Sequence, residues 1–425
     1  MKSISDTPDE KNIYVWNIIG SVINALLSVV ILILVTRMVD DVQADIFSIA
    51  WTIGQLMATV GTFQLRMYQA TDVKEVYKFQ QYLIFRFITI FIMMVSSYLY
   101  IVSRGYNIYK TVIILIVCLF RAIEALDDVY EGWFQQKERL DLVGKAITYR
   151  VIISLLAFGV ILKISKDVMY ACVALLIGYI LCFFWFDVRY YFNIKKIKEK
   201  QYVDKGWKWI LGLTIEGAPL FINAFLLMSI TNEPKMVIDS AIERGVIGNG
   251  IQTIFNILFM PASFLSLAYI IFRPLITKMA IMWNTNEKSE FVKILKKISI
   301  GLLIMGVAIL IGSALLGIPI LSIVYAVDLS KYKTHLLVLI LGGCFYTFST
   351  VFDNALVVIR KQYILIVPYF FTWIYIKLVS DWMLSQWKVM GAAITYTSAM
   401  IFLLVLTAIL FVICLNKEKD WKRSL

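Results

Sequence analysis

The chain is built from long apolar blocks, each about the length of a helix that crosses a lipid bilayer. Such a helix needs ~20 mostly apolar residues, because it spans hydrocarbon about 30 Å thick with its backbone polar groups bonded internally. Apolar residues make up 60% of the 425-residue chain, more than a soluble protein can bury. Twelve such blocks occur, at 13–35, 46–65, 82–102, 110–130, 147–163, 168–187, 208–230, 245–272, 296–325, 335–358, 362–380 and 389–415. We therefore predict an all-α polytopic membrane protein with about 12 transmembrane helices.

The distribution of positive charge indicates how these helices are oriented. The chain has 41 lysine and arginine residues against 29 acidic residues, a net charge of +12. When the N-terminus is placed in the cytoplasm, most of the basic residues fall in cytoplasmic segments, as the positive-inside rule requires. We therefore predict that both termini are cytoplasmic (N-in and C-in). The positive charge then faces anionic lipid, and nucleic acid is not an expected partner.

A basic segment divides the predicted helices into two halves of six. It covers residues 191–207, and we interpret it as a cytoplasmic linker. Residues 1–190 are predicted to form an N-terminal six-helix lobe, and residues 208–425 a C-terminal six-helix lobe, around a central cavity. Asn24 and Asn223 occupy matching positions in the first helix of each half, within the similar stretches INALL and INAFL. A parallel repeat of this kind is common in transporters.

Several predicted membrane helices carry polar residues at helical spacing, so that these residues share one face. The fourth block is the most charged, with Arg121, Glu124, Asp128 and Glu131 at i, i+3, i+7 and i+10. Polar groups are costly in hydrocarbon, so this face needs water or partners. A hydrated cavity and hydrogen bonding between helices remain open as interpretations. For Arg121 the alternatives are an internal ion pair with Glu124 and binding of an anionic headgroup.

Known catalytic motifs are absent from the sequence. It has no G-x-x-x-x-G-K-[S/T] loop and no H-E-x-x-H motif. The one histidine, His335, lies at the edge of a predicted helix, and the five cysteines lie singly in apolar blocks. We therefore expect no metal, no resident cofactor and no enzymatic activity. Transport is the expected function of two six-helix halves around a polar cavity.

Two segments that follow predicted helices carry a distinctive set of polar residues. They are RMYQATDVK at 66–74 and DVYEGWFQQKERLD at 128–141, and the first helix adds GSVINA at 20–25 with Thr36 and Arg37 behind it. This set resembles the signatures of Wzx-type polysaccharide repeat-unit flippases. These form the polysaccharide transporter branch of the multidrug/oligosaccharidyl-lipid/polysaccharide exporter (MOP) superfamily. The resemblance is strongest over residues 1–155.

The resemblance implies two six-helix lobes with alternating access. The implied substrate is an undecaprenyl-pyrophosphate-linked oligosaccharide of the capsule, O-antigen or teichoic-acid type. A pyrophosphate needs cations, and a sugar headgroup needs a hydrated cavity that forms hydrogen bonds. The family motif places Arg66, Gln69, Asp72, Asp128 and Arg139 near the cytoplasmic mouth, where a network of ion pairs that locks the helices is the alternative. The expected substrate-binding residues are Asn24, Arg66, Gln69, Asp72, Arg86, Arg121, Glu124, Asp128, Arg139, Arg150, Asn223 and Arg273. For Arg86, Arg150 and Arg273, contact with lipid phosphates at helix ends is an alternative role.

The sequence also offers candidates for energy coupling and for partner proteins. Glu124, Glu216 and Asp353 are candidates for binding H⁺ or Na⁺, although a flippase driven by removal of its product needs neither ion. The expected partners are membrane lipids, a polysaccharide polymerase and glycosyltransferases, in the bacterial cytoplasmic membrane. One alternative function is a cation-coupled small-molecule or drug exporter of the same superfamily. Another is a membrane glycosyltransferase or polymerase, which the short predicted outer loops disfavour.

Overall fold

Helices make up all the regular structure of the described chain. The structure is a computed structural model that describes residues 9–72, 74–194, 206–268, 273–285 and 287–421. Within these ranges no residue lies in a strand, and eight helices are long and apolar enough, by length and composition, to cross a membrane. The predicted all-α class is confirmed. The count of about 12 crossings and the N-in, C-in orientation stay predictions.

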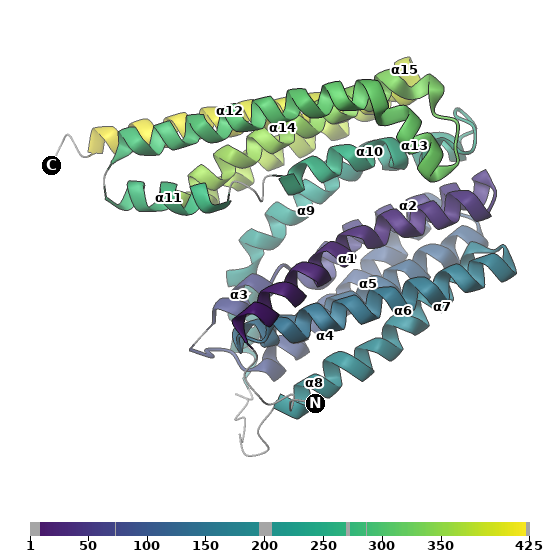
Figure 1. The fold of residues 1–425 in the computed structure, drawn as a ribbon, viewed down its shortest axis with the longest axis horizontal. Coiled ribbons are helices and arrows are strands. Elements are labelled where there is room, and N and C mark those ends of the chain that lie inside the picture. The colour runs from purple at the N-terminus through teal and green to yellow at the C-terminus, as the bar shows by residue number, and fades with distance from the viewer. Residues whose placement is uncertain (1–8, 73, 195–205, 269–272, 286, 422–425) are drawn as a thin grey trace. The chain divides into compact units, whose positions relative to one another are not determined.

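The first of two compact units comprises Met1–Phe225. In this unit α1 lies beside α6, and α2 lies beside α4 and α5 (Figure 1). A π-helical turn, Phe183–Val188, joins α7 to α8. The helices of the unit are α1 (Glu10–Met38), α2 (Asp41–Thr62), α3 (Arg66–Thr71), α4 (Phe79–Arg104), α5 (Ile108–Gln136), α6 (Leu140–Ser165), α7 (Val168–Cys182), α8 (Arg189–Ile194) and the first part of α9 (Lys208–Glu243).

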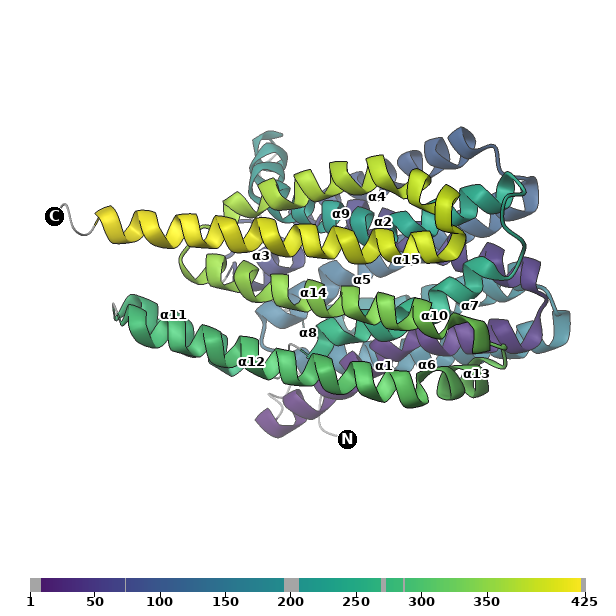
Figure 2. The ribbon, with the colours of Figure 1, turned by 90° about the horizontal axis from the view of Figure 1, so that it is seen from above.

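The second unit comprises Leu226–Leu425. Here α14 packs against α10, α12 and α15, as Figure 2 shows from above. The long α15 contains non-helical backbone at Trp387 and Lys388, so it consists of two helical segments. The unit contains the rest of α9, then α10 (Ile251–Ala268), α11 (Arg273–Asn284), α12 (Lys288–Gly312), α13 (Ile318–Tyr325), α14 (Lys333–Val358) and α15 (Ile366–Trp421).

The unit boundary lies inside α9, between Phe225 and Leu226. The sequence instead predicts a lobe at 1–190, a linker at 191–207 and a lobe at 208–425. Residues 195–205 of that linker lie outside the described part of the chain. Residues 208–225 of α9 group with the first unit, where the Phe221 ring stacks on Phe63 at a centroid distance of 4.6 Å.

Backbone contact between α1 and α6 holds the first unit together at one point. A Cβ atom on Gly20 would lie 2.8 Å from the Cα atom of Gly144, and one on Gly144 would lie 2.0 Å from the Trp16 carbonyl oxygen. Only glycine permits this approach, as in many membrane helix pairs. Because the helices are this close, polar residues on α1 come within reach of α5 and α6.

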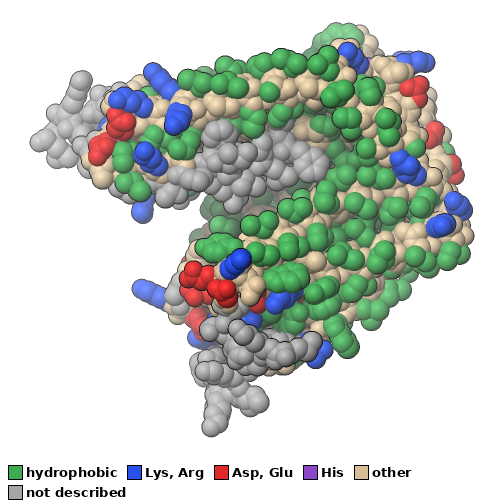
Figure 3. All heavy atoms as spheres, viewed as in Figure 1, with side chains coloured by type: hydrophobic (Ala, Val, Ile, Leu, Met, Phe, Trp, Pro, Cys, Tyr) green, Lys and Arg blue, Asp and Glu red, His purple; other side chains and the backbone are tan. Residues whose placement is uncertain are grey.

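The outer surface of each unit is suited to contact with lipid. In Figure 3, hydrophobic side chains cover the flanks of the helices, and charged side chains gather toward helix ends. Large apolar residues such as Phe91 and Leu99 on α4 and Leu181 on α7 are exposed. An exposed apolar flank with polar residues turned inward is the arrangement expected in a bilayer.

Candidate functional site: a polar pocket in the first unit

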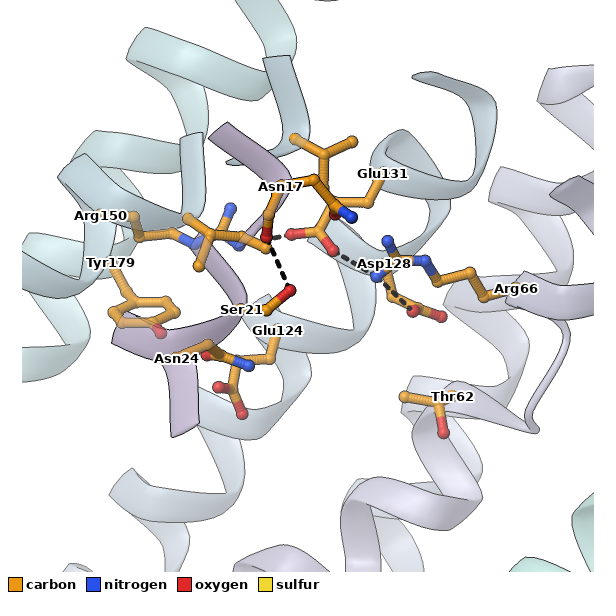
Figure 4. Close-up of a pocket in the computed structure, with 12 residues that line it drawn as sticks. Asn17, Ser21, Asn24, Thr62, Arg66, Glu124, Asp128, Glu131, Arg150 and Tyr179 are labelled. Carbon is orange, nitrogen blue, oxygen red and sulfur yellow. Dashed lines mark hydrogen bonds and ion pairs between the residues drawn. The ribbon is translucent and has the colours of Figure 1, made fainter. Parts of the chain in front are cut away.

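A polar pocket of about 330 Å³ lies inside the first unit. Five helices and the short α3 contribute to it, and most of the lining side chains carry a charge, an amide or a hydroxyl (Figure 4). The lining residues are Asn17, Ser21, Asn24, Thr62, Arg66, Glu124, Asp128, Glu131, Val143, Ile147, Arg150 and Tyr179. A pocket this polar is unusual in a membrane helix bundle and points to a hydrophilic ligand.

The polar faces of two helices, α1 and α5, line this pocket. Asn17, Ser21 and Asn24 lie at i, i+4 and i+7 on α1, and the Ser21 hydroxyl donates to the Asn17 carbonyl at 2.7 Å. On α5, Glu124, Asp128 and Glu131 follow the same spacing and line the pocket. The sequence pattern therefore identifies two of the faces that meet here.

The turn after α2 brings an arginine to the pocket. Phe63 and Gln64 have left-handed backbone conformations, φ 46° and 53°, and so end α2 and turn the chain into α3. Arg66, the first residue of α3, pairs with Glu131 and lies 3.8 Å from Asp128. Its side chain is 31% exposed, which makes it the most accessible arginine in this cluster.

Arg86 on α4 is more deeply buried, and both of its terminal guanidinium nitrogens have partners. Its guanidinium donates to the Asp128 carboxylate at 2.7 Å and to the Gly61 carbonyl oxygen at 2.8 Å. These bonds tie α4 to both α2 and α5. A buried guanidinium held in this way cannot leave its partners without a large desolvation penalty, so Arg86 acts to position Asp128.

Arg150 on α6 forms the centre of the network. It lies 2.7 Å from Glu131, 2.8 Å from Asp187 and 3.0 Å from Asp127. Asp187 comes from the π-helical turn after α7, a type of irregularity often found at functional sites. One arginine therefore joins α5, α6 and the end of α7.

The charges of this described network do not balance. Arg66, Arg86 and Arg150 face four carboxylates, which are Asp127, Asp128, Glu131 and Asp187. The carboxylates therefore exceed the guanidinium groups by one. Burial makes an uncompensated charge expensive, so the network favours uptake of one further positive charge.

Arg121 and Glu124 form the internal ion pair that the sequence left open as one alternative. The Arg121 guanidinium also lies over the Trp51 ring, 4.2 Å from its centroid. Glu124 lines the pocket, whereas Arg121 is not among the lining residues. Arg121 thus affects the pocket through Glu124.

The other motif residues build the base of the unit without lining the pocket. Buried Gln69 donates to the Val129 carbonyl oxygen at 3.0 Å. The Asp72 carboxylate accepts the backbone N–H groups of Val76 and Tyr77, which shapes the loop before α4. Arg139 pairs with Asp141 at 2.9 Å, at the start of α6.

The remaining predicted residues lie elsewhere in the chain. Asn223 is on α9, and its side-chain oxygen is buried without a hydrogen-bond partner. Glu216, also on α9, accepts from the Tyr68 hydroxyl of α3, and burial together with this carboxylate raises the pKa of Tyr68. Asp353 on α14 of the second unit accepts from the Tyr369 hydroxyl at 2.6 Å. The side chain of Arg273 lies outside the described residues. The three carboxylates predicted to bind a coupling ion therefore lie in different places: Glu124 at the pocket, Glu216 on α9 beside Tyr68, and Asp353 on α14 of the second unit.

Three members of the network were not among the predicted substrate-binding or coupling residues. The sequence placed Glu131 on the charged face of the fourth block without assigning it a role, and it missed Asp127 and Asp187. The signal in the sequence that points to Asp127 and Asp187 is Arg150, which lies near the start of a predicted membrane helix. An arginine at that position needs carboxylate partners if it does not reach lipid phosphates. On α5, helical spacing places Asp128 on the charged face and leaves its neighbour Asp127 off that face. Asp187 lies at the end of an apolar block. Only the fold brings both to Arg150.

Comparison with known proteins places this geometry in context. No family model matches the chain. The chain is 24% identical over 385 residues to the capsular polysaccharide biosynthesis protein CapF of Staphylococcus aureus, and the match covers 89% of this chain and 93% of that protein. This relative supports the resemblance to the polysaccharide branch of the MOP superfamily.

Solved structures share the fold over nearly the whole chain. One is a multidrug resistance MATE family transporter of the MOP superfamily in an inward-facing conformation. It is 12% identical with a TM-score of 0.71, and the match covers 95% of this chain and 99% of that one. Another is the Vibrio cholerae MATE transporter VcmN in its bent form, 11% identical with a TM-score of 0.58, covering 97% of this chain and 98% of that one. The chain therefore has the fold of these MATE transporters. The fold and the capsular polysaccharide relative together bear out the resemblance drawn from the sequence.

Proposed function

We propose that this multi-pass membrane protein is a flippase for an undecaprenyl-pyrophosphate-linked oligosaccharide repeat unit, of the capsule, O-antigen or teichoic-acid type. In this proposal it works in the bacterial cytoplasmic membrane. The exporter fold and the capsular polysaccharide relative support this proposal. The observation that carries it is the pocket of the first unit, where amides, hydroxyls, carboxylates and arginines replace the apolar lining typical of a drug site.

A sugar headgroup fits this lining by its chemistry. Sugar hydroxyl groups both donate and accept hydrogen bonds, and Asn17, Ser21 and Asn24 offer both functions from one face of α1. The lipid tail would stay in the bilayer while the headgroup crosses. An apolar drug would cover these polar groups without giving them hydrogen-bond partners, which disfavours the small-molecule exporter.

Among the arginines, we assign the pyrophosphate contact to Arg66. It is at the pocket, its side chain is 31% exposed, and its planar guanidinium suits phosphate oxygens. Arg86 and Arg150 hold Asp128 and Glu131 in place. Glu131 would retain Arg150 when Arg66 turns to the substrate. Arg273, whose side chain lies outside the described residues, remains a proposed second contact.

Alternating access requires two lobes that move against each other. We propose that the twelve apolar blocks form twelve crossings with both termini in the cytoplasm, six in each lobe. Each lobe would then carry its own polar groups toward the path of the headgroup. A polysaccharide polymerase and the glycosyltransferases that build the repeat unit are the proposed partners.

We place cation coupling at the pocket of the first unit. Its network carries one more carboxylate than guanidinium groups, so a proton or Na⁺ would neutralise it. Glu124 lines the same pocket and is the predicted coupling residue nearest to the network. Glu216 and Asp353 lie elsewhere and would act as secondary sites.

The proposal is tested by blocking the pocket without altering its charge. In a strain that lacks this gene, Ser21→Leu would fill the pocket, whereas Val22→Leu changes an exposed neighbour on α1. We expect wild type and Val22→Leu to restore surface polysaccharide. We expect Ser21→Leu, at equal membrane abundance, to leave lipid-linked units accumulated inside the cell. Normal surface polysaccharide with Ser21→Leu would contradict the proposal.

A further inference from the structure

The second unit contains a buried polar segment within a membrane-type helix. The last part of α9 carries Asn232, Glu233, Lys235 and Asp239, and all four are buried. Burial of a charged group is expensive unless a partner compensates it. Each member of this segment therefore needs a partner, and the partners differ.

Two residues near the start of this segment are satisfied by α15. The Glu233 carboxylate pairs with Lys377, and one turn earlier the Ser229 hydroxyl accepts from the Trp373 indole N–H at 3.0 Å. Asp239, one turn beyond Lys235, is engaged with another group. These contacts explain how α9 and α15 pack, and they leave Lys235 to be explained.

Lys235 has no acidic partner among the described residues. It is 8% exposed, and its ammonium lies over the Phe259 ring of α10, 4.4 Å from the centroid. A cation over an aromatic face is worth about 0.5–2 kcal/mol. That does not offset the several kcal/mol typical for taking an ammonium out of water. The site is therefore incomplete as it stands.

Two side-chain amides with unpaired nitrogen atoms accompany this lysine. Asn232 precedes Lys235 by three positions and so shares its face of α9, and its amide nitrogen is buried without an acceptor. Gln252 precedes Phe259 by seven positions and so shares its face of α10, and neither of its amide atoms has a hydrogen-bond partner. Because Lys235 contacts Phe259, these two faces pack together.

We propose that Lys235, with Asn232 and Gln252, forms an oxyanion-binding site in the second unit, an inference that rests on the proposed flippase function. Three groups able to donate hydrogen bonds, one of them charged, match a phosphate or carboxylate group. Lys235 lies 27 positions beyond the start of α9, roughly 40 Å along the helix. An acidic sugar or the pyrophosphate of the substrate would supply the oxyanion.

The site would act as a selectivity element. An anionic headgroup offsets the desolvation of Lys235, whereas a neutral headgroup leaves the ammonium and both amides unpaired. The protein would therefore favour repeat units that bring an anionic group to this point.

The test measures anion binding by the purified full-length protein in detergent. The probes are inorganic pyrophosphate and trigalacturonate, with the neutral maltotriose as reference, followed by the ligand-induced shift of the melting temperature. We expect at least one anion to bind and Lys235→Met to weaken that binding about tenfold or more. Lys331→Met removes an exposed lysine of the same unit and should leave affinity unchanged. The anion that responds identifies the group that the site takes.

Equal affinity of wild type and Lys235→Met for both anions would overturn the inference, and so would a wild type that binds neither. If Lys235→Met does not fold, Gln252→Met, which keeps the lysine, should weaken binding severalfold, and unchanged affinity would again overturn it. Failure of the wild type to move lipid-linked sugar would instead overturn the proposed function. The two failures are therefore distinguishable.

Discussion

Replacing Arg150 by methionine tests the charged network most severely. The substitution keeps most of the side-chain volume and removes the cation that Asp127, Glu131 and Asp187 share at 2.7–3.0 Å. Breaking a buried ion pair by removing one partner typically costs about 3–5 kcal/mol. For a unit of this size, 1 kcal/mol shifts the melting temperature by about 2–4 °C. We therefore expect the melting temperature to fall by about 6–20 °C.

The assay is thermal unfolding of the purified protein, followed by tryptophan fluorescence at a fixed scan rate, because membrane proteins often unfold irreversibly. Arg66→Met is the matched control. It removes a partly exposed arginine and leaves Glu131 with Arg150 and Asp128 with Arg86, so its melting temperature should fall less. This account of the network would be refuted if Arg150→Met melted within about 2 °C of wild type, or if Arg66→Met melted below Arg150→Met.

Three further predictions follow from the structure. Gly144→Ala places a Cβ atom against the Trp16 carbonyl oxygen and should destabilise the protein by about 1–3 kcal/mol in thermal unfolding, whereas Gly159→Ala on the same helix has room. Glu75 has its pKa lowered by its lysine partners, so its stabilisation is present at neutral pH and lost as pH falls through the lowered pKa. The melting temperature of Glu75→Gln should therefore lie slightly below wild type at pH 7, and the two should converge as the pH falls below the lowered pKa of Glu75. Arg121→Ala should abolish surface polysaccharide at normal membrane abundance, and Arg121→Lys should restore part of it; full polymer with Arg121→Ala would exclude a role in transport.

Helical spacing predicted one face of the pocket almost completely. Glu124, Asp128 and Glu131 are separated by four and three positions, and all three line the pocket. Asn24 on α1 was expected to bind substrate and also lines it. These residues were identifiable because a polar residue in an apolar block must face something other than lipid.

Contacts between distant segments could not be read from spacing. Asp187 lies 37 positions from Arg150, and the π-helical turn that directs it inward has no signal in the sequence. The seventh predicted membrane block ends at residue 230, so the sequence places the polar stretch around Lys235 after that helix. In the structure α9 continues through this stretch to Glu243. Tertiary partners such as Lys377 compensate the buried charge and so stabilise that continuation.

The central claim is tested most directly by translocation in proteoliposomes. The purified protein is reconstituted with a labelled undecaprenyl-pyrophosphate oligosaccharide, and a membrane-impermeant glycosidase is added outside. We predict that cleavage proceeds beyond the fraction that was exposed at the start, and that it does so only when the protein is present. Cleavage that stops at the level of protein-free liposomes, with folded protein and with a pH or Na⁺ gradient in place, would contradict the account.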